Sequence, residues 1–264
     1  MVGKFDTAHW HSTIGQIIEA ESADAISAAL ADLIGQTVPH EGTCLLAFHR
    51  DARPDVLHHT LESASRKHYL ERYLAGPYLL DPLYQLALRS RKPSLCRFRD
   101  ELPDRFRLSE YYRQYCEQTH LLDEMDYLFS VDENTTLVLV VGRQRRMFTK
   151  AEVQRLKLIE PTVQACISQV WRYSGNRPPR QERSDTVHER LIDCFEKFGE
   201  SVLTERERQI SQLLLRGHST KSIARVLRIA PGTVMVHKRN LFAKLDISSQ
   251  YELFSLFISQ LGSG

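Results

Sequence analysis

The chain has 264 residues, enough for one medium-sized domain and one small one. Its hydrophobic content of 42% and charged content of 26% are ordinary for a globular protein, and its net charge is only +2. No apolar run approaches the roughly 18 residues of a membrane helix, and the N-terminus lacks a signal-peptide pattern, so we expect a cytoplasmic protein. The five cysteines are scattered and odd in number, which argues against a disulfide framework or a metal site.

Helical and strand patterns alternate along the first 172 residues. Helical spacing of apolar residues covers residues 6–37 as two helices, and then 65–74, 82–89, 108–120 and 150–171. Strand-like segments cover residues 43–49, 56–60, 94–98, 123–131 and 135–142, and a turn signal at residues 132–134 joins the last two as a hairpin. This order predicts an α+β fold, an α-β-α sandwich with an antiparallel sheet.

A polar stretch then divides the chain. Residues 173–186 contain two prolines and one glycine and show no periodicity, which is typical of a linker. We therefore predict one domain at residues 1–172 and a second, all-α domain of four helices at residues 187–264. A helix over residues 187–198 leads into that second domain.

Three short helices follow between residues 203 and 245. Thr204 can cap the first helix, and Gly217 ends it. Ser219 or Thr220 can cap the second helix, and Pro231 suits the first turn of the third. Short helices joined by tight turns in this way are typical of a helix-turn-helix.

The third of these helices has a face that the core does not use. Val234, Leu241 and Leu245 point inward at helical spacing. The residues left over are Met235, Val236, Arg239 and Ala243. Residues 204–245 hold nine Lys or Arg and two acidic residues, a local net charge of +7, which is the electrostatic footprint expected of a DNA-binding module.

The motifs of this region resemble those of a known family. L-T-x-R-E at 203–207, G-x-S at 217–219, I-A-x-x-L at 223–227, T-V-x-x-H at 233–237 and K-L at 244–245 resemble the C-terminal domain of LuxR-type transcription regulators. The resemblance implies that the third helix enters the major groove of DNA. It assigns base contacts to Met235, Val236 and Arg239, and we assign phosphate contacts to Thr233, Lys238 and Lys244. His237 matches a family histidine, for which we favour a packing role.

The resemblance extends more weakly to the first domain. In LuxR-type quorum-sensing regulators a ligand domain of this size comes first, and residues 68–82 here resemble the part that holds an acyl-homoserine lactone. The resemblance implies that Tyr69, Tyr73 and Asp81 bind the ligand. Two other interpretations stay open: Asp81-Pro82 is also an ordinary helix start, and two tyrosines four residues apart can belong to the core.

Two departures from the family count against a lactone. Phe98 and Phe106 occur where a tryptophan is expected, and three acids, Asp123, Glu124 and Asp126, begin the hairpin. Strand alternation puts Glu124 and Asp126 on one face and Asp123 on the other. An acidic pair facing the pocket would favour a polar or cationic ligand. We favour the interpretation in which the pair faces water and carries no information on the ligand.

The sequence thus predicts a ligand-responsive transcription regulator that binds double-stranded DNA as a homodimer on a two-fold site. No catalytic or nucleotide-binding motif is present, so we expect neither enzyme activity nor a cofactor. In the alternative, the first domain is a protein-interaction module. A closed apolar cavity large enough for a ligand would favour sensing, and a core filled by side chains with an exposed apolar patch would favour the partner protein. The last helix, at residues 249–261, is rich in apolar residues. Part of it, including Phe257, is predicted to pair two DNA-binding domains, with core packing as the alternative.

Overall fold

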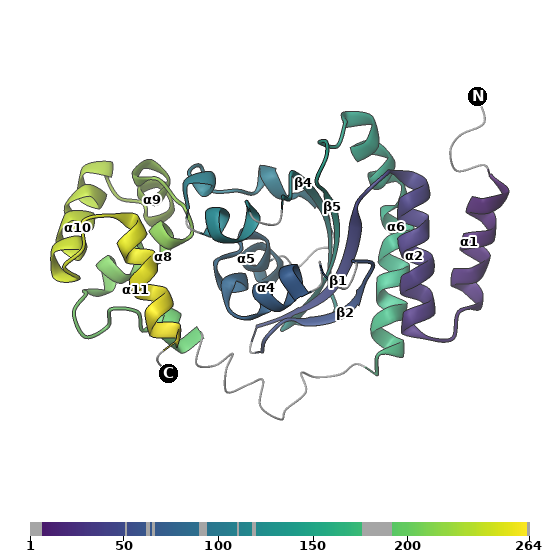
Figure 1. Ribbon diagram of the computed structural model, residues 1–264, viewed down its shortest axis with the longest axis horizontal. Coiled ribbons are helices and arrows are strands. Elements are labelled where there is room, and N and C mark those ends of the chain that lie inside the picture. The colour runs from purple at the N-terminus through teal and green to yellow at the C-terminus, as the bar shows by residue number, and fades with distance from the viewer. Residues whose placement is uncertain are drawn as a thin grey trace.

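The computed structural model describes residues 7–50, 52–61, 64, 67–89, 94–109, 111–117, 120–175 and 192–262. It confirms the α+β fold, with a sheet between helices and a helical C-terminal domain beyond one of its faces (Figure 1). The strands are β1 (Gly42–His49), β2 (Asp55–His59), β3 (Ser94–Arg97), β4 (Asp123–Ser130) and β5 (Thr135–Arg143). The helices of the first domain are α1 (Ala8–Glu19), α2 (Ala23–Thr37), α4 (Arg72–Leu74), α5 (Pro82–Arg89) and α6 (Lys150–Tyr173).

The five strands form one sheet in the order β2-β1-β5-β4-β3, and every neighbouring pair is antiparallel. The predicted hairpin is β4 and β5. Its turn is held by Asp132, whose carboxylate accepts hydrogen bonds from the backbone N–H groups of Asn134 and Thr135, both at 2.7 Å. Because both faces of the sheet are covered, the three central strands β1, β5 and β4 are buried along nearly their whole length, whereas the edge strands β2 and β3 are only partly buried.

One face of the sheet packs against α2 and α6, with α1 outside them (Figure 1). Ser22 caps α2, and its hydroxyl accepts from the N–H of Ala25. Thr149 caps α6 in a capping box with Glu152, and the helix continues through Pro161 to Tyr173. Burial of the apolar stripes of these helices against Leu137, Leu139 and Val141 of β5 fixes the helical layer on the sheet.

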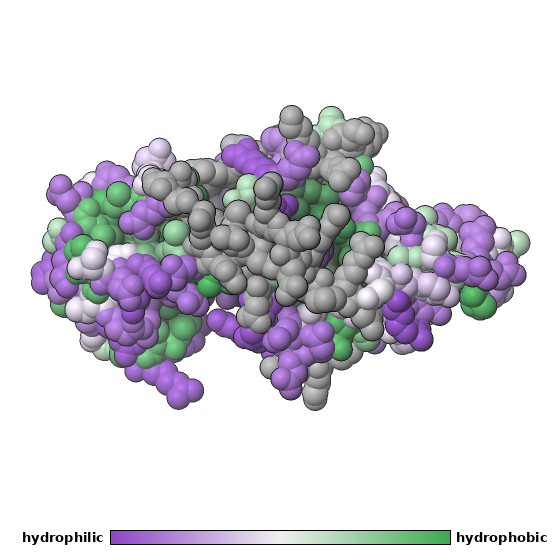
Figure 2. Space-filling model, turned by 90° about the horizontal axis from the view of Figure 1, so that it is seen from below, coloured by the Kyte–Doolittle hydropathy of each residue, from purple (hydrophilic) through white to green (hydrophobic). Residues whose placement is uncertain are grey.

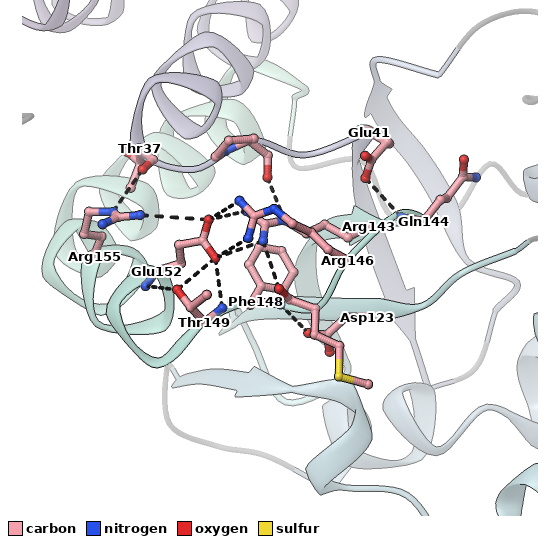
Figure 3. A network of polar contacts seen from close by, with 12 residues as sticks. Thr37, Glu41, Asp123, Arg143, Gln144, Arg146, Phe148, Thr149, Glu152 and Arg155 are labelled. Atoms are coloured by element: carbon pink, nitrogen blue, oxygen red, sulfur yellow. Dashed lines mark hydrogen bonds and ion pairs between the residues drawn. The ribbon is translucent and has the colours of Figure 1, made fainter.

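A buried ion pair ties the end of β5 to the start of α6 (Figure 3). Two guanidinium nitrogens of Arg143 donate to the carboxylate of Glu152 at 2.9 and 3.0 Å, and its Nε donates to the carbonyl of Pro39 at 2.7 Å. Arg146 adds two further bonds to the same carboxylate from a side chain that is 52% exposed. These bonds hold the pKa of Glu152 well below its usual range.

The opposite face is covered by less regular segments, and here two predictions need correction. The helix expected at 65–74 is a π-helical turn, η1 (Lys67–Glu71), that leads into α4; residues 65 and 66 lie outside the described residues. The helix expected at 108–120 is also shorter. It consists of a 3-10 turn, η4 (Phe106–Leu108), and a π-helical turn, η5 (Tyr112–Cys116). Ser109 interrupts it, because its hydroxyl accepts from the N–H of Tyr112 and starts a new turn.

The C-terminal domain contains α8 (Glu205–Leu215), α9 (Thr220–Leu227), α10 (Pro231–Lys244) and α11 (Gln250–Gly262). Thr204 caps α8 in a capping box with Glu207, and Ser219 caps α9. Gly217 follows α8 with a φ of 86°, a conformation that favours glycine. The start of this domain and the linker predicted at 173–186 fall largely on residues 176–191, outside the described residues. Residues 192–196, within the helix predicted at 187–198, are helical.

The hypothesis that part of the last helix pairs two DNA-binding domains does not hold for Phe257. Phe257 is buried in the core of its own domain, in edge-to-face contact with the rings of Phe195 and Phe198 at 5.4 and 5.8 Å. Core packing, the alternative, therefore accounts for this part of α11. In the described part of the chain, no helix combines the length and apolar character needed to cross a membrane.

The buried ion pair yields a stability prediction. Glu152→Ala leaves Arg143 buried without its counter-ion, so we expect the free energy of unfolding to fall by about 3–5 kcal/mol. The stabilisation is present above the ordinary pKa of a glutamate and is lost as the pH falls through and below it, because the folded-state pKa is depressed. Urea unfolding at pH 7 measures the change. Arg146→Ala removes the exposed partner of the same carboxylate and should have little effect on the free energy of unfolding, because solvent screens exposed ion pairs; equal losses in the two variants would contradict the prediction.

Candidate DNA-binding face and sensor cavity

The outer face of α10 is exposed as predicted. Val234 and Leu241 are fully buried, whereas Met235 is 63% and Val236 47% exposed, and Thr233 and Arg239 are also on the surface. Leu245, predicted to point inward, is half-buried and packs against the core. Hydrophilic side chains make up much of the surface at this end of the molecule, with smaller hydrophobic areas between them (Figure 2). The structure thus places the predicted base-contacting residues together on one accessible face.

The two lysines predicted to contact phosphate have partners within the domain. Lys238 is half-buried, and its Nζ lies 5.2 Å from the ring centre of Phe242. The Nζ of Lys244 donates to the carboxylate of buried Glu207 at 2.8 Å. Burial raises the pKa of Glu207, but the bonds from Lys244 and Thr204 outweigh it, and the pKa is below its ordinary value. Lys244 therefore also fastens the end of α10 to the start of α8.

A segment of the first domain lies against the start of α9. The carboxylate of Asp104 accepts from the backbone N–H of Ser219 at 2.9 Å and from the Ser219 hydroxyl. The N–H of Arg105 donates to the carbonyl of Gly217 at 3.1 Å. A Cβ atom at Gly217 would lie 2.9 Å from the Cα of Phe106, so only glycine allows this close approach. The same segment borders a cleft of about 740 Å³ that Met235, Lys238 and Arg239 also line.

A second hollow lies inside the first domain, between the sheet and the segment that contains α4 and α5. It is a cavity of about 140 Å³, large beside the roughly 10–15 Å³ that one water needs. Apolar and aromatic side chains make up most of its wall. These include Leu46, Phe48, Leu70, Leu83, Phe98, Tyr111 and Val140. An apolar cavity with a few polar groups is the usual form of a small-molecule site.

Two of the three residues predicted to bind a ligand meet in this cavity. The hydroxyl of Tyr73 donates to one oxygen of Asp81 at 2.7 Å, and both residues line the wall. The other oxygen of Asp81 accepts from the N–H of Leu83 at 2.8 Å, so Asp81 is also the N-cap of α5. Burial raises the pKa of Asp81 to about 6, against the lowering effect of these bonds. The side chain of Tyr69 lies outside the described residues.

The acidic pair of β4 is buried, so the interpretation in which it faces water is wrong. Glu124 lines the cavity, and Asp126 is 0% exposed on the same face of the strand. Burial and the nearby Asp81 carboxylate raise the pKa of Glu124 to about 8. Burial and the neighbouring Glu124 raise that of Asp126 well above its usual range. Asp123 points to the opposite face, as alternation predicts, and forms an ion pair with Arg97.

Sequence reasoning missed some residues that complete this arrangement. Phe98 and Tyr111 line the cavity, and each ring contacts that of Phe106, with ring centres 5.6 and 5.7 Å apart. Glu41 also lines the cavity. Phe98 was singled out only as a replacement for tryptophan, and no signal in the sequence marked Tyr111 or Glu41.

The helix-turn-helix and the sandwich domain together define a two-domain DNA-binding regulator. Residues 201–257 match the family described as "Bacterial regulatory proteins, luxR family". A helix-turn-helix transcriptional regulator from Aeromonas salmonicida, named for its place in the exeN 3′ region, is 32% identical over 157 residues, which are 58% of this chain and 80% of the relative. The chain therefore belongs to the LuxR family of bacterial regulatory proteins.

Two further likenesses cover the first domain. The monoamine regulon transcriptional regulator of Klebsiella aerogenes is 26% identical over 240 residues, 90% of this chain and 93% of the relative. The crystal structure of the VqsR ligand-binding domain from Pseudomonas aeruginosa superposes with a TM-score of 0.56 and 28% identity, covering 63% of this chain and 99% of that domain. The sandwich thus has the fold of the ligand-binding domains of such regulators.

The buried carboxyls yield a prediction on pH. Because the folded-state pKa of Glu124 is raised from 4.5 to about 8, the folded protein holds a proton that the unfolded chain releases. Its free energy of unfolding should therefore fall as the pH rises through that window. Glu124→Gln removes one of the buried carboxyls that cause this dependence, so between pH 5 and pH 8 the free energy of unfolding should fall less steeply in the variant than in the wild type. Asp126 and Asp81, whose pKa values are also raised, supply the remaining slope. Urea titrations at both pH values measure the difference. Glu19→Gln, the same change on α1, should leave the slope intact, and an unchanged slope for Glu124→Gln would refute the prediction.

Proposed function

We propose that this protein is a transcription regulator in which a small molecule bound in the sensor cavity controls operator binding by the C-terminal domain. The observation that carries the proposal is the position of residues 98–111. Phe98 and Tyr111, at the two ends of this segment, line the cavity. Asp104 and Arg105, in its middle, bond to the turn between α8 and α9. A displacement of the cavity wall would therefore also displace residues that contact the DNA-binding domain.

The contact that Asp104 makes with Ser219 has a consequence for DNA binding. The start of a helix presents free N–H groups and a partial positive charge, which makes it a binding site for an anion. In helix-turn-helix proteins the helix before the recognition helix crosses the DNA backbone, so its N-terminus suits a phosphate. The Asp104 carboxylate bonds to the N–H and hydroxyl of Ser219 at this place. We infer that it competes with DNA phosphate and that ligand binding releases it through Phe98, Phe106 and Tyr111.

The cavity favours ligand sensing over the alternative, in which the first domain only binds a partner protein. A core filled by side chains would favour the partner, whereas this domain keeps a partly open apolar cavity whose wall also carries a few polar groups. Acyl-homoserine lactones are one candidate class. The Klebsiella aerogenes relative is named for a monoamine regulon, so amines are another.

On DNA, we propose that Met235, Val236 and Arg239 contact bases and that Thr233, Lys238 and Lys244 contact phosphates. The exposure of Met235, Val236 and Arg239 on one face supports the first assignment. A single small domain offers few base contacts, so we propose that two copies bind a two-fold operator.

Arg239→Ala tests the base assignment. Because Arg can donate two hydrogen bonds to one guanine, its loss should cost about 1–3 kcal/mol at one base position and relax the preference there. Lys221→Ala, which removes an exposed charge at the start of α9, should weaken binding to all sequences alike. An operator selected from random duplexes, and its single-base variants, provide the titration series. Identical losses across the whole series for both variants would overturn the assignment.

Asp104→Ser tests control by the sensor domain. The change removes the carboxylate from Ser219, so the ligand-free protein should bind operator DNA about 5- to 30-fold more tightly, the factor that one or two kcal/mol represents. Asp100→Ser is the matched control, because it removes the same charge from an exposed residue of the same segment. Fluorescence anisotropy with a labelled operator measures both. Equal gains for the two variants would show that only net charge matters.

A further inference from the structure

The sensor cavity has an unusual balance of charge. Two buried carboxylic acids, Asp81 and Glu124, line it, and its described lining includes no Lys, Arg or His. Glu41 also lines it, but this side chain is exposed and accepts a hydrogen bond from the N–H of Gln144. Asp126 lies beside Glu124 on the same face of β4, and its partner on β5, Val140, also lines the cavity. A site that concentrates acids without a protein counter-ion suits a positively charged ligand.

The acids of this group differ in how well their oxygens are bonded. Asp81 is satisfied by Tyr73 and by the N–H of Leu83. Asp126 is not: both of its oxygens are fully buried, and in the described part of the chain the only group that can share a proton with them is the Glu124 carboxyl. Glu124, another acid, is its neighbour. A buried carboxyl without a donor costs free energy, and a bound donor would remove that cost.

The apolar part of the cavity wall indicates what the uncharged part of a ligand would look like. Phe48, Phe98 and Tyr111 present aromatic surface, and Leu46, Leu70 and Leu83 present aliphatic surface. A molecule that fills this space needs an apolar body as well as a polar group that meets the acids. Aromatic faces next to an ammonium group add a favourable cation–π term.

We propose that the ligand is a protonated primary amine with an aromatic or short aliphatic body, whose ammonium group binds between Glu124 and Asp81 with Asp126 behind them. The proposal rests on the sensing role proposed above and names the class of molecule sensed. An ammonium group supplies three N–H donors, enough to serve oxygens on more than one of these acids. A lactone supplies one amide N–H and brings carbonyl oxygens close to carboxyl oxygens.

Binding of the amine should release protons. In the ligand-free protein, burial and mutual proximity favour the protonated forms of Glu124 and Asp126. An adjacent ammonium favours the ionised form instead, so at least one of the two carboxyls loses its proton to the buffer when the amine enters. This release separates an amine held by ionised acids from an apolar molecule that only fills the cavity.

The test is isothermal titration calorimetry of the full-length protein at pH 7. Phenethylamine is the cationic probe, 2-phenylethanol is its neutral counterpart of nearly the same shape, and N-hexanoyl-homoserine lactone represents the family's ligands. We expect phenethylamine to bind at least about tenfold more tightly than 2-phenylethanol. Its heat should vary with the ionisation enthalpy of the buffer, in the direction of proton release. Glu124→Gln and Asp126→Asn should each weaken phenethylamine by about tenfold or more, and Glu19→Gln should not.

Several results would overturn the proposal that the ligand is an amine. These are equal affinity for 2-phenylethanol, the absence of binding heat with phenethylamine, hexylamine and putrescine at millimolar concentration, or an unaltered affinity in both carboxamide variants. The proposed function is tested separately, by operator binding with and without each probe. If the lactone binds and alters DNA affinity, the proposed sensing function stands and the proposal of an amine ligand fails. If the amine binds without an effect on DNA affinity, the amine proposal stands and the proposed sensing function fails.

Discussion

The central constraint on this molecule is a sheet that is buried on both faces. Successive side chains of a strand point to opposite faces, so β4 must divide its three acids between two apolar layers. Asp123 goes to the helical layer and finds a cation in Arg97. Glu124 and Asp126 go to the other layer, where no cation from the described chain lines the cavity. The acids on one face of the sheet are therefore paired with cations, as Glu152 is with Arg143, whereas the other face keeps a cavity whose buried acids have no cationic partner among the described residues that line it.

The layer on the cavity side of the sheet forms both the cavity wall and the surface that contacts the DNA-binding domain. Its segments are short turns, with π-helical and 3-10 geometry at η1, η4 and η5, and not long helices. Such turns leave side chains such as Phe98 and Tyr111 to form the cavity wall. Their backbones remain on the outside, where Arg105 meets Gly217. Cavity and docking surface are thus two sides of one thin layer, with the Phe106 ring packed between Phe98 and Tyr111.

The C-terminal domain could be predicted from the sequence almost residue by residue, because its signals are local. Thr204, Ser219 and Pro231 act within one turn of the helices that they begin. The strands were also predictable, from short runs of apolar and β-branched residues bounded by turn signals. The burial of Glu124 and Asp126 was not, because alternation says that two residues share a face and leaves open what covers it. The docking of Asp104 on Ser219 joins residues 115 positions apart, and no local pattern encodes such a contact.

Gly217 combines two requirements in one position. Its positive φ ends α8 in the geometry that leads into α9, and its missing side chain admits the backbone of Phe106. Any larger residue would strain the turn of the helix-turn-helix and push the sensor domain away at the same time. A substitution at Gly217 cannot weaken the contact between the two domains without also deforming the helix-turn-helix. Asp104 has no such second role. A substitution there can therefore change how strongly the sensor domain holds the DNA-binding domain without deforming the helix-turn-helix.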